Sequence, residues 1–323
     1  MRDHGGDLDA AIARHGGAAE AWVDLSTGIN AVPYPVPKLS AHAWGALPTK
    51  SDLRALEDAA RAAYGAGVRA IPLAGASGAI QLAPLLAAPG KARVLGPTYN
   101  EHAAALATAG WAVETVSELA ALEGADLAVV VNPNNPDGRS HAPEALLALA
   151  PKVGLLVVDE SFADTEDGLS VIPAMTPDTG GLLVMRSFGK FYGLAGLRLG
   201  FALAGDALAG RIAELAGPWP VSGAAVEIGC KALADRAWQD ATTARLREEA
   251  ARLDALAARA GWTLVGGSPL FRTYETGDAQ AAQERLAKAR TWSRIFPYSE
   301  GWIRLGLPGD VNGWLRLEVA LGG

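Results

Sequence analysis

The sequence predicts an α/β fold in which a large, mostly parallel sheet lies between helices and is accompanied by a smaller α/β layer. Three apolar runs carry this prediction: residues 124–131 (GADLAVVV), 153–160 (VGLLVVDE) and 180–187 (GGLLVMRS). A helical pattern, APEALLALA at 142–150, separates the first two runs. Apolar strands that alternate with helices are typical of a parallel sheet that is covered on both faces.

The C-terminal third of the chain has a different pattern. Residues 237–260 predict a long amphipathic helix, because apolar positions recur there at helical spacing. Two strand-like runs, TWSRIFPY at 291–298 and GWIRLGLP at 301–308, follow a second helical segment. These elements predict the smaller layer. The Pro- and Gly-containing segment 216–225 marks the expected boundary between the layers.

The composition is that of a soluble globular protein. Of 323 residues, 50% are hydrophobic and 20% are charged, and the net charge of −7 gives no general attraction for nucleic acid. Cys230 is the single cysteine, which excludes an internal disulfide framework. The N-terminus lacks the apolar segment of a signal peptide, and no uncharged apolar stretch of about 18 residues could span a membrane. We therefore expect a cytoplasmic protein with neither a nucleic-acid nor a membrane partner.

Polar residues follow each of the three predicted strands. The first strand runs into NPNNPDG at 132–138, the second ends at Asp159, and the third leads into Ser187, Gly189 and Lys190. Ligands of open parallel sheets bind outside the carboxyl ends of the strands, so these groups are expected to meet at one site. Upstream, GASGA at 75–79 opens a helix, and such a small-residue turn can present backbone N–H groups to a phosphate.

Each of these signals has an ordinary structural explanation when it is taken alone. An aspartate at the end of a strand can cap a helix, a small-residue turn can be only a turn, and a lysine in an apolar stretch can extend to the surface. Taken together and in this order, they describe one chemical device. It consists of a lysine that forms an imine with an aldehyde, an aspartate for a pyridinium nitrogen, an asparagine for a ring oxygen, and phosphate ligands.

The order of the motifs GASGA, PTY, NPNNPDG, DES, SFGK and GLRLG resembles the fold-type I, pyridoxal 5′-phosphate-dependent aminotransferases of class I/II, over essentially the whole chain. The resemblance implies a large cofactor-binding domain at residues 35–220 and a small domain built from both termini, residues 1–34 and 221–323. It also implies a homodimer with pyridoxal 5′-phosphate as its cofactor and no metal.

The resemblance assigns a cofactor role to individual residues. It implies that Lys190 holds the cofactor aldehyde and that Asp159 keeps the pyridine nitrogen protonated. Asn135 corresponds to the asparagine that donates to the ring oxygen, and Tyr99 to the aromatic residue that stacks on the ring. The phosphate is expected to lie against Arg198, Ser187, Ala76 and Ser77.

Two N-terminal segments, HGGDLDAAIARHGG at 4–17 and DLSTGINAVPYP at 24–35, resemble the threonine-phosphate decarboxylase and cobalamin-biosynthesis branch, close to histidinol-phosphate aminotransferase. This branch implies that the substrate carries a carboxylate and a phosphate, and that arginines bind both anions. The substrate residues implied are His4, Gly5, Gly28, Asn135, Arg294 and Arg304.

Four positions depart from the family pattern. Phe162 stands where many members have a tyrosine that donates to the ring oxygen, and Gly189 where many have a serine or threonine before the lysine. Leu47 replaces a tyrosine that reaches the cofactor phosphate of a neighbouring subunit. Gly28 replaces an asparagine that contacts the substrate of the decarboxylases.

The resemblance implies decarboxylation of L-threonine O-3-phosphate to (R)-1-amino-2-propanol O-2-phosphate in cobalamin biosynthesis, in possible association with other proteins of that pathway. Two alternatives stay open. One is transamination of the histidinol-phosphate type, because the bond at Cα that stands perpendicular to the cofactor ring decides which reaction follows. The other is a non-catalytic, cofactor-binding partner of a cobinamide-modifying complex.

Overall fold

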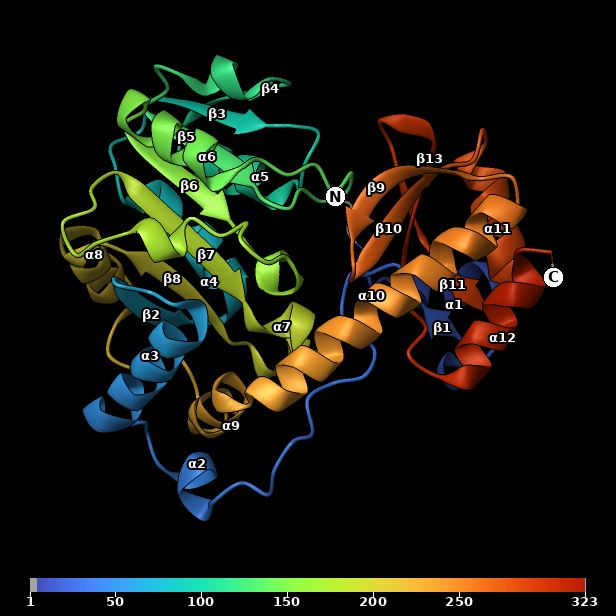
Figure 1. Ribbon diagram of the computed structural model, residues 1–323, viewed down its shortest axis with the longest axis horizontal. Helices are drawn as coiled ribbons and strands as arrows, with labels where there is room; N and C mark the ends of the chain where they lie inside the picture. Colours follow the sequence, from blue (N-terminus) through green and yellow to red (C-terminus); the bar gives the residue numbers. More distant parts are fainter. Residues whose placement is uncertain (1–4, 323) are drawn as a thin grey trace. The chain divides into compact units, whose positions relative to one another are not determined.

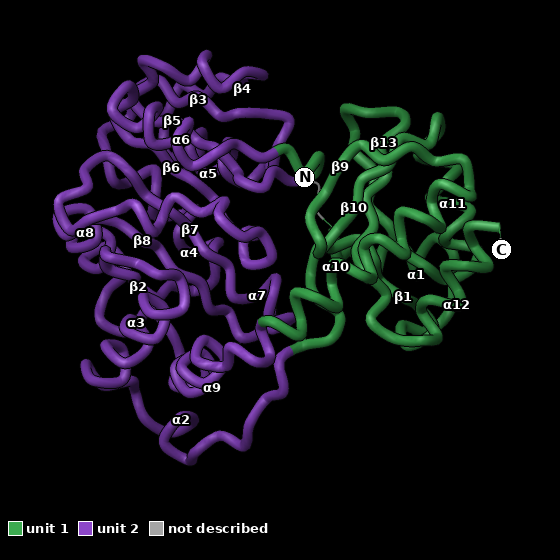
Figure 2. Tube along the Cα trace, viewed as in Figure 1, with its two compact units in different colours: residues 1–33, 136–139, 240–323 green, residues 34–135, 140–239 purple. Residues whose placement is uncertain are grey.

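The computed structural model describes residues 5–322 and divides them into two compact units, which Figure 2 shows in different colours. The larger unit consists of residues 34–135 and 140–239, and the smaller unit of the remaining described residues. His4 lies outside the described residues. Among the described residues, no helix has the length and apolar character that a membrane crossing requires.

A seven-stranded sheet forms the centre of the larger unit (Figure 1). Its strands, in spatial order, are β2 (Arg69–Leu73), β8 (Gly200–Ala204), β7 (Leu182–Ser187), β6 (Leu155–Asp159), β5 (Leu127–Val131), β3 (Lys91–Leu95) and β4 (Ala112–Val116). Neighbouring strands are parallel except at β8, which runs antiparallel to both of its neighbours. All residues of β5, β6 and β7 are buried. The predicted mostly parallel sheet with apolar central strands is therefore confirmed.

The larger unit also contains helices. They are α2 (Ala41–Gly45), α3 (Lys50–Tyr64), α4 (Gly75–Leu82), α5 (Glu101–Thr108), α6 (Pro143–Leu149), α7 (Phe188–Phe191), α8 (Asp206–Ala216) and α9 (Gly223–Ala234). One buried cluster joins side chains of the sheet to α4, α5 and α8. The helix α3 begins at a capping box formed by Thr49 and Asp52 and ends at Gly65 in the left-handed conformation, so local sequence fixes both of its ends.

The smaller unit has its own α/β architecture. A four-stranded antiparallel sheet has the order β12 (Arg294–Phe296), β13 (Ser299–Gly306), β10 (Phe271–Glu275) and β9 (Thr263–Ser268). A short parallel pair joins β1 (Val23–Asp24) to β11 (Thr291–Trp292), so both ends of the chain contribute to this unit. The helices are α1 (Leu8–His15), residues 240–259 of α10 (Arg236–Arg259), α11 (Ala279–Lys288) and α12 (Val311–Ala320).

The division into units differs from the expected domains at three places, of which the smallest is Tyr34, a residue of the larger unit. Residues 221–239, expected in the small domain, belong to the larger unit, because α9 packs closely on α2 and α3. A Cβ atom at Gly229 would lie 2.7 Å from Leu56 Cδ1, which shows how tight that packing is. Residues 136–139, expected in the large domain, belong to the smaller unit, where the Pro136 carbonyl accepts a hydrogen bond from Thr273 Oγ1 (2.5 Å).

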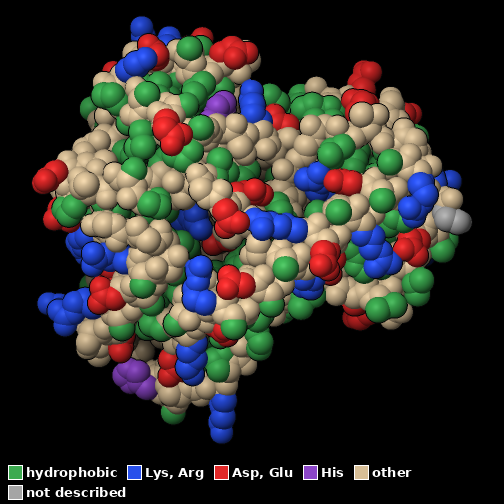
Figure 3. Space-filling model, in the orientation of Figure 1, with side chains coloured by type: hydrophobic (Ala, Val, Ile, Leu, Met, Phe, Trp, Pro, Cys, Tyr) green, Lys and Arg blue, Asp and Glu red, His purple; other side chains and the backbone are tan. Residues whose placement is uncertain are grey.

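The surface carries charges of both signs. On the face shown in Figure 3, Lys and Arg side chains are interspersed with Asp and Glu side chains. A mixed surface of this kind does not concentrate positive potential on that face.

Candidate active site

A cavity of about 100 Å³ lies in the larger unit beside the carboxyl ends of β5, β6 and β7. The residues that line it include every residue expected to bind the cofactor: Ala76, Ser77, Tyr99, Asn135, Asp159, Ser187, Lys190 and Arg198. These residues come from segments spread over more than a hundred positions of the sequence. The structure thus brings the predicted set together at one place, while the role of each residue remains a prediction.

Asp159 ends β6 and is buried, with 3% of its surface exposed. His102 Nε2 lies 2.8 Å from its Oδ2 atom, and the backbone N–H and hydroxyl of Ser161 both donate to Oδ1, the N–H at 2.9 Å. Burial by itself would raise the pKa of Asp159, but the hydrogen bond and charge of His102 and the two bonds from Ser161 outweigh it and hold the pKa below its usual value. Asp159 is therefore a carboxylate that stays ionised in a buried position.

His102 and Ser161 were not identified from the sequence. His102 lies in the first turn of α5, three residues after Tyr99, and is 3% exposed. A histidine three residues after a predicted ring-stacking residue was the available signal, but nothing in the sequence pairs it with a carboxylate 57 positions away. Ser161 belongs to the DES motif itself and could have been assigned from its position two residues after Asp159.

Lys190 lies in the short helix α7, which begins directly after β7. Its neighbours in this helix, Phe188 and Phe191, are buried and anchor the turn in the core. Lys190 is half-buried, and its Nζ atom lies 5.5 Å from the centre of the Phe162 ring. The predicted apolar environment of Lys190 therefore includes Phe162, which has no hydroxyl to donate to a ligand.

Donors for an anion also line this cavity. The helix α4 begins there without a side-chain cap at Ala74, so its first N–H groups are available to a ligand. Arg198 has a left-handed backbone (φ 55°), and its Nη2 atom lies 3.5 Å from Ser77 Oγ. A Cβ atom at Gly75 would lie 3.0 Å from that Nη2 atom, so glycine leaves room for the guanidinium. A strained arginine beside a helix N-terminus is typical of a functional site.

One departure from the family pattern, Gly189, has a structural explanation. A Cβ atom at Gly189 would lie 2.9 Å from Ala195 Cα, so the loop that follows α7 approaches too closely for serine or threonine. Leu47 lies between α2 and α3 and is 61% exposed. It is not among the residues that line the cavity.

Side-chain amides fix the loops that carry Asn135 and Tyr99. Asn132 exchanges two hydrogen bonds with the backbone of His141 (2.8 and 3.1 Å). Asn134 accepts from Thr98 Oγ1 (2.6 Å) and donates to the carbonyl of Pro97 (2.9 Å). The two loops are thereby connected to each other directly.

The donor set of this cavity fits pyridoxal 5′-phosphate. A buried carboxylate suits the pyridine nitrogen, the Lys190 amine suits the aldehyde, and the Asn135 amide suits the ring oxygen. The first N–H groups of α4, Ser77 and Arg198 together suit a phosphate.

The expected substrate arginines lie on adjacent strands of the smaller unit. Arg294 in β12 is the direct cross-strand partner of Arg304 in β13. Like charges directly opposite each other on a sheet are unfavourable unless an anion compensates them. Arg304 is buried, donates from Nη2 to the carbonyl of Ser26 (2.5 Å) and lies 5.4 Å above the Phe271 ring. The structure thus places the two arginines opposite each other on the sheet, while their anion-binding role remains a prediction.

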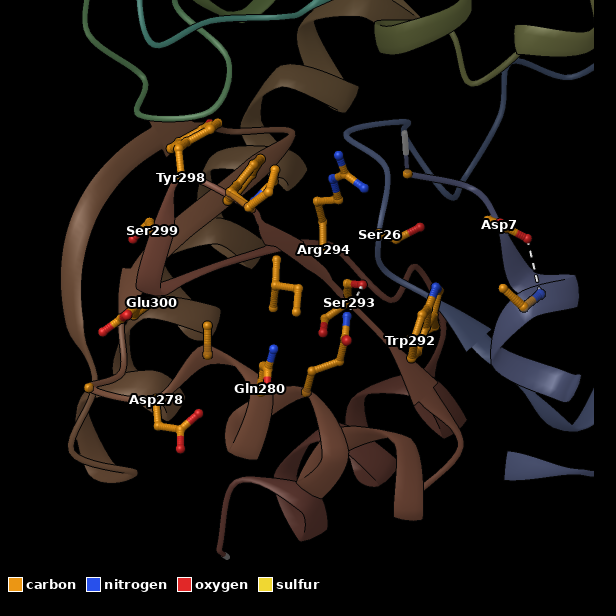
Figure 4. A pocket seen from close by; sticks show the side chains of 18 residues that line it. Asp7, Ser26, Asp278, Gln280, Trp292, Ser293, Arg294, Tyr298, Ser299 and Glu300 are labelled. Atoms are coloured by element: carbon orange, nitrogen blue, oxygen red, sulfur yellow. Dashed lines mark hydrogen bonds between the residues drawn. The ribbon is translucent and has the colours of Figure 1, made fainter. Parts of the chain in front are cut away.

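A second cavity, of about 920 Å³, lies in the smaller unit (Figure 4). Figure 4 shows Ser26 and Arg294 among the residues that line it, and Gly5 also contributes. Arg304 does not line this cavity, although a Cβ atom at Gly5 would lie 3.5 Å from its Nη2 atom. Gly28 is buried after β1 and lines neither cavity.

Ser26 is a further residue that sequence reasoning missed. It is 1% exposed, its Oγ atom accepts from the N–H of Gly6 (2.7 Å), and it donates to Asp24 Oδ1 (2.5 Å). Its carbonyl is the acceptor for Arg304. Ser26 thus connects the N-terminal segment to the buried arginine.

Comparison with known proteins agrees with this architecture. The family model "Aminotransferase class I and II" matches residues 42–320. A threonine-phosphate decarboxylase of Sinorhizobium sp. is 44% identical over 98% of this chain and 97% of its own length, and one of Pseudomonas aeruginosa is 42% identical over 99% and 97%. The crystal structure of histidinol-phosphate aminotransferase from Sinorhizobium meliloti in complex with pyridoxal-5′-phosphate has the same fold, with a TM-score of 0.83, 20% identity, and coverage of 97% of this chain and 93% of that one. The chain therefore belongs to the aminotransferase class I and II family.

Proposed function

We propose that this chain is a pyridoxal 5′-phosphate-dependent decarboxylase that converts L-threonine O-3-phosphate to (R)-1-amino-2-propanol O-2-phosphate and CO2, in cobalamin biosynthesis. One observation carries the proposal. A chain that aligns along nearly its whole length with two threonine-phosphate decarboxylases gathers Lys190, Asp159 and Asn135 around one cavity. The cross-strand pair Arg294 and Arg304 adds the cations that a substrate with two anionic groups needs.

The bound cofactor would supply a protonated ring that delocalises the electron pair left at Cα when the carboxylate departs. Asp159 would serve this chemistry as a buried anion for the ring nitrogen, and His102 and Ser161 favour its ionised form. Asn135 would donate its amide to the ring oxygen. Arg198, Ser77 and the N-terminus of α4 would hold the phosphate.

Lys190 Nζ has two tasks in this proposal. It would hold the cofactor aldehyde in the resting enzyme, and its ammonium form would return a proton to the substrate Cα after CO2 has left. The Phe162 ring, 5.5 Å from Nζ, offers this amine an apolar surface.

The arginines would orient the substrate. Arg304 is fixed by the Ser26 carbonyl and the Phe271 ring, whereas Arg294 is half-buried at the wall of the larger cavity. The bond to the carboxylate must stand perpendicular to the cofactor ring for decarboxylation, whereas a perpendicular C–H bond leads to transamination. The positions of the two anions of the substrate therefore decide the reaction.

The experiment that tests the proposal is CO2 release from L-threonine O-3-phosphate by the purified protein with pyridoxal 5′-phosphate. Lys190→Ala serves as the control. We expect release by the wild type and none by the variant. Conversion of the bound cofactor to its pyridoxamine form without CO2 release would favour transamination of the histidinol-phosphate type. Absence of a visible cofactor band would favour a non-catalytic partner of a cobinamide-modifying complex.

We further propose that the chain acts in the cytoplasm as a homodimer, with other cobalamin-pathway proteins as possible partners. Trp44, Leu47 and Val36 are 74%, 61% and 57% exposed in and around α2, and a second copy would cover this apolar surface. Sedimentation analysis tests the dimer. A monomer at micromolar concentration would contradict it.

A further inference from the structure

A buried ionic cluster lies at the carboxyl ends of β6 and β7. Arg186 donates from Nη1 to Glu160 Oε2 (3.1 Å) and from Nη2 to Asp164 Oδ1 (3.0 Å). The exposed fractions of the three side chains are 7%, 0% and 7%. Buried salt bridges contribute little net stability against well-packed apolar side chains, so a cluster this deeply buried calls for another role.

The guanidinium holds both ends of segment 160–164. Between these ends, Ser161 donates two hydrogen bonds to Asp159, and Phe162 places its ring 5.5 Å from Lys190 Nζ. One side chain therefore fixes the segment that orients the carboxylate and forms the surface next to the lysine.

Further contacts hold Glu160 and Arg186 in place. Glu160 also accepts from Ser170 Oγ (2.6 Å) and from the N–H of Val171 (2.9 Å). Arg186 belongs to β7, directly before Ser187, and its guanidinium lies 4.4 Å from the centre of the Tyr64 ring. The cluster therefore connects the ends of two strands that both deliver residues to the cavity.

The two carboxyl groups of Glu160 and Asp164 need a cation that can donate to both of them at once, as the planar guanidinium of Arg186 does. Burial raises the pKa of Glu160 and of Asp164, although the charge of Arg186 opposes this effect at both carboxyl groups. Lysine would keep the positive charge but has no planar fork with which to span two carboxylates. The geometry, rather than the charge alone, thus requires arginine here.

We propose that Arg186 is a positioning residue for the cofactor site: it holds segment 160–164 so that Asp159 faces the ring nitrogen and Phe162 faces Lys190. The part that concerns the ring rests on the proposed function. The part that concerns the segment depends only on the residues of this chain.

Arg186→Lys tests the proposal, and Arg69→Lys is its matched control. Arg69 forms a two-armed pair with Glu57 in the same unit (3.0 and 3.1 Å), and neither residue lines the cavity. Three properties are measured: the dissociation constant for pyridoxal 5′-phosphate, the pH at which the visible band of the bound cofactor changes, and hydrogen exchange of the Ser161 amide in cofactor-free protein. Unfolding in urea is recorded alongside to separate stability from positioning.

We expect Arg186→Lys to weaken cofactor binding by about tenfold, which corresponds to about 1.4 kcal/mol, to shift the pH midpoint of the band, and to speed exchange at Ser161. Arg69→Lys should change none of the three. Unchanged binding, band and exchange in an Arg186→Lys protein that is merely less stable would overturn the proposal.

If Arg186→Lys does not fold, Asp164→Asn replaces it, because this change loosens only one arm of the clamp. It should change the same three properties by a smaller amount, and no change would again overturn the proposal. If the wild type binds no cofactor, the proposed function fails. Exchange at Ser161 then decides by itself whether Arg186 holds the segment.

Discussion

The contact between His102 and Asp159 gives a prediction whose size follows from the structure. His102→Leu removes the donor 2.8 Å from Asp159 Oδ2 while preserving roughly the volume of the side chain. A hydrogen bond to a charged group contributes about 1.5–3 kcal/mol. Loss of this donor should raise the pKa of Asp159 and lower the free energy of unfolding at neutral pH by an amount of that order.

The pH dependence follows from the direction of the wild-type shift. The folded-state pKa of Asp159 is lowered, so its ionisation stabilises the fold above the unfolded pKa of about 3.9, and this contribution is lost as the pH falls through the folded pKa. His102→Leu raises the folded pKa. Its stability deficit should therefore be full at pH 7 and should shrink as the pH falls through the raised value.

Urea unfolding of cofactor-free protein between pH 7 and pH 4 measures this effect, and His102→Gln is the matched control. The amide of glutamine can occupy the position of Nε2 and keep a neutral donor, so we expect a smaller deficit. Equal deficits in the two variants, or a deficit that does not change with pH, would show that His102 does not hold the charge of Asp159.

Three further predictions concern single contacts. Gly75→Ala should weaken pyridoxal 5′-phosphate binding by about tenfold in a fluorescence titration, because its Cβ atom would crowd Arg198 Nη2 at 3.0 Å and the backbone there has φ 74°; unchanged affinity would remove Arg198 from the phosphate site. Gly138→Ala should lower the free energy of unfolding by more than about 3 kcal/mol, because its Cβ atom would clash with the backbone of Gly267. A loss below about 1 kcal/mol would show that the backbone of this loop can move to relieve the clash, and would contradict the prediction. Ser26→Ala should raise KM for L-threonine O-3-phosphate more than it lowers kcat, because Ser26 connects the N-terminal segment to Arg304; an unchanged KM would contradict that role.

The chemistry at the strand ends could be predicted from the sequence because each strand and the polar residue that follows it are contiguous. Asp159 and Lys190 come directly after apolar runs, so their common location follows from the rule for open parallel sheets. The cross-strand pairing of Arg294 with Arg304 was not foreseen as such. It depends on the register of a hairpin, which the sequence of two short strands does not determine.

Contacts between distant segments account for what the sequence did not reveal. His102 meets Asp159 across 57 positions, and Ser26 meets Arg304 across 278. Gly189 departs from the family pattern, and the close approach of Ala195 explains this glycine as a steric requirement. Such contacts depend on tertiary packing and leave no periodicity or motif in the sequence.

The central claim is that Lys190 holds pyridoxal 5′-phosphate in the cavity of the larger unit. Borohydride reduction of the protein incubated with this cofactor, followed by peptide mapping in a mass spectrometer, tests the claim most directly. The account predicts that the cofactor is fixed on Lys190 and that Lys190→Ala carries no specific label. A label on another lysine, or no label on the wild type, would contradict it.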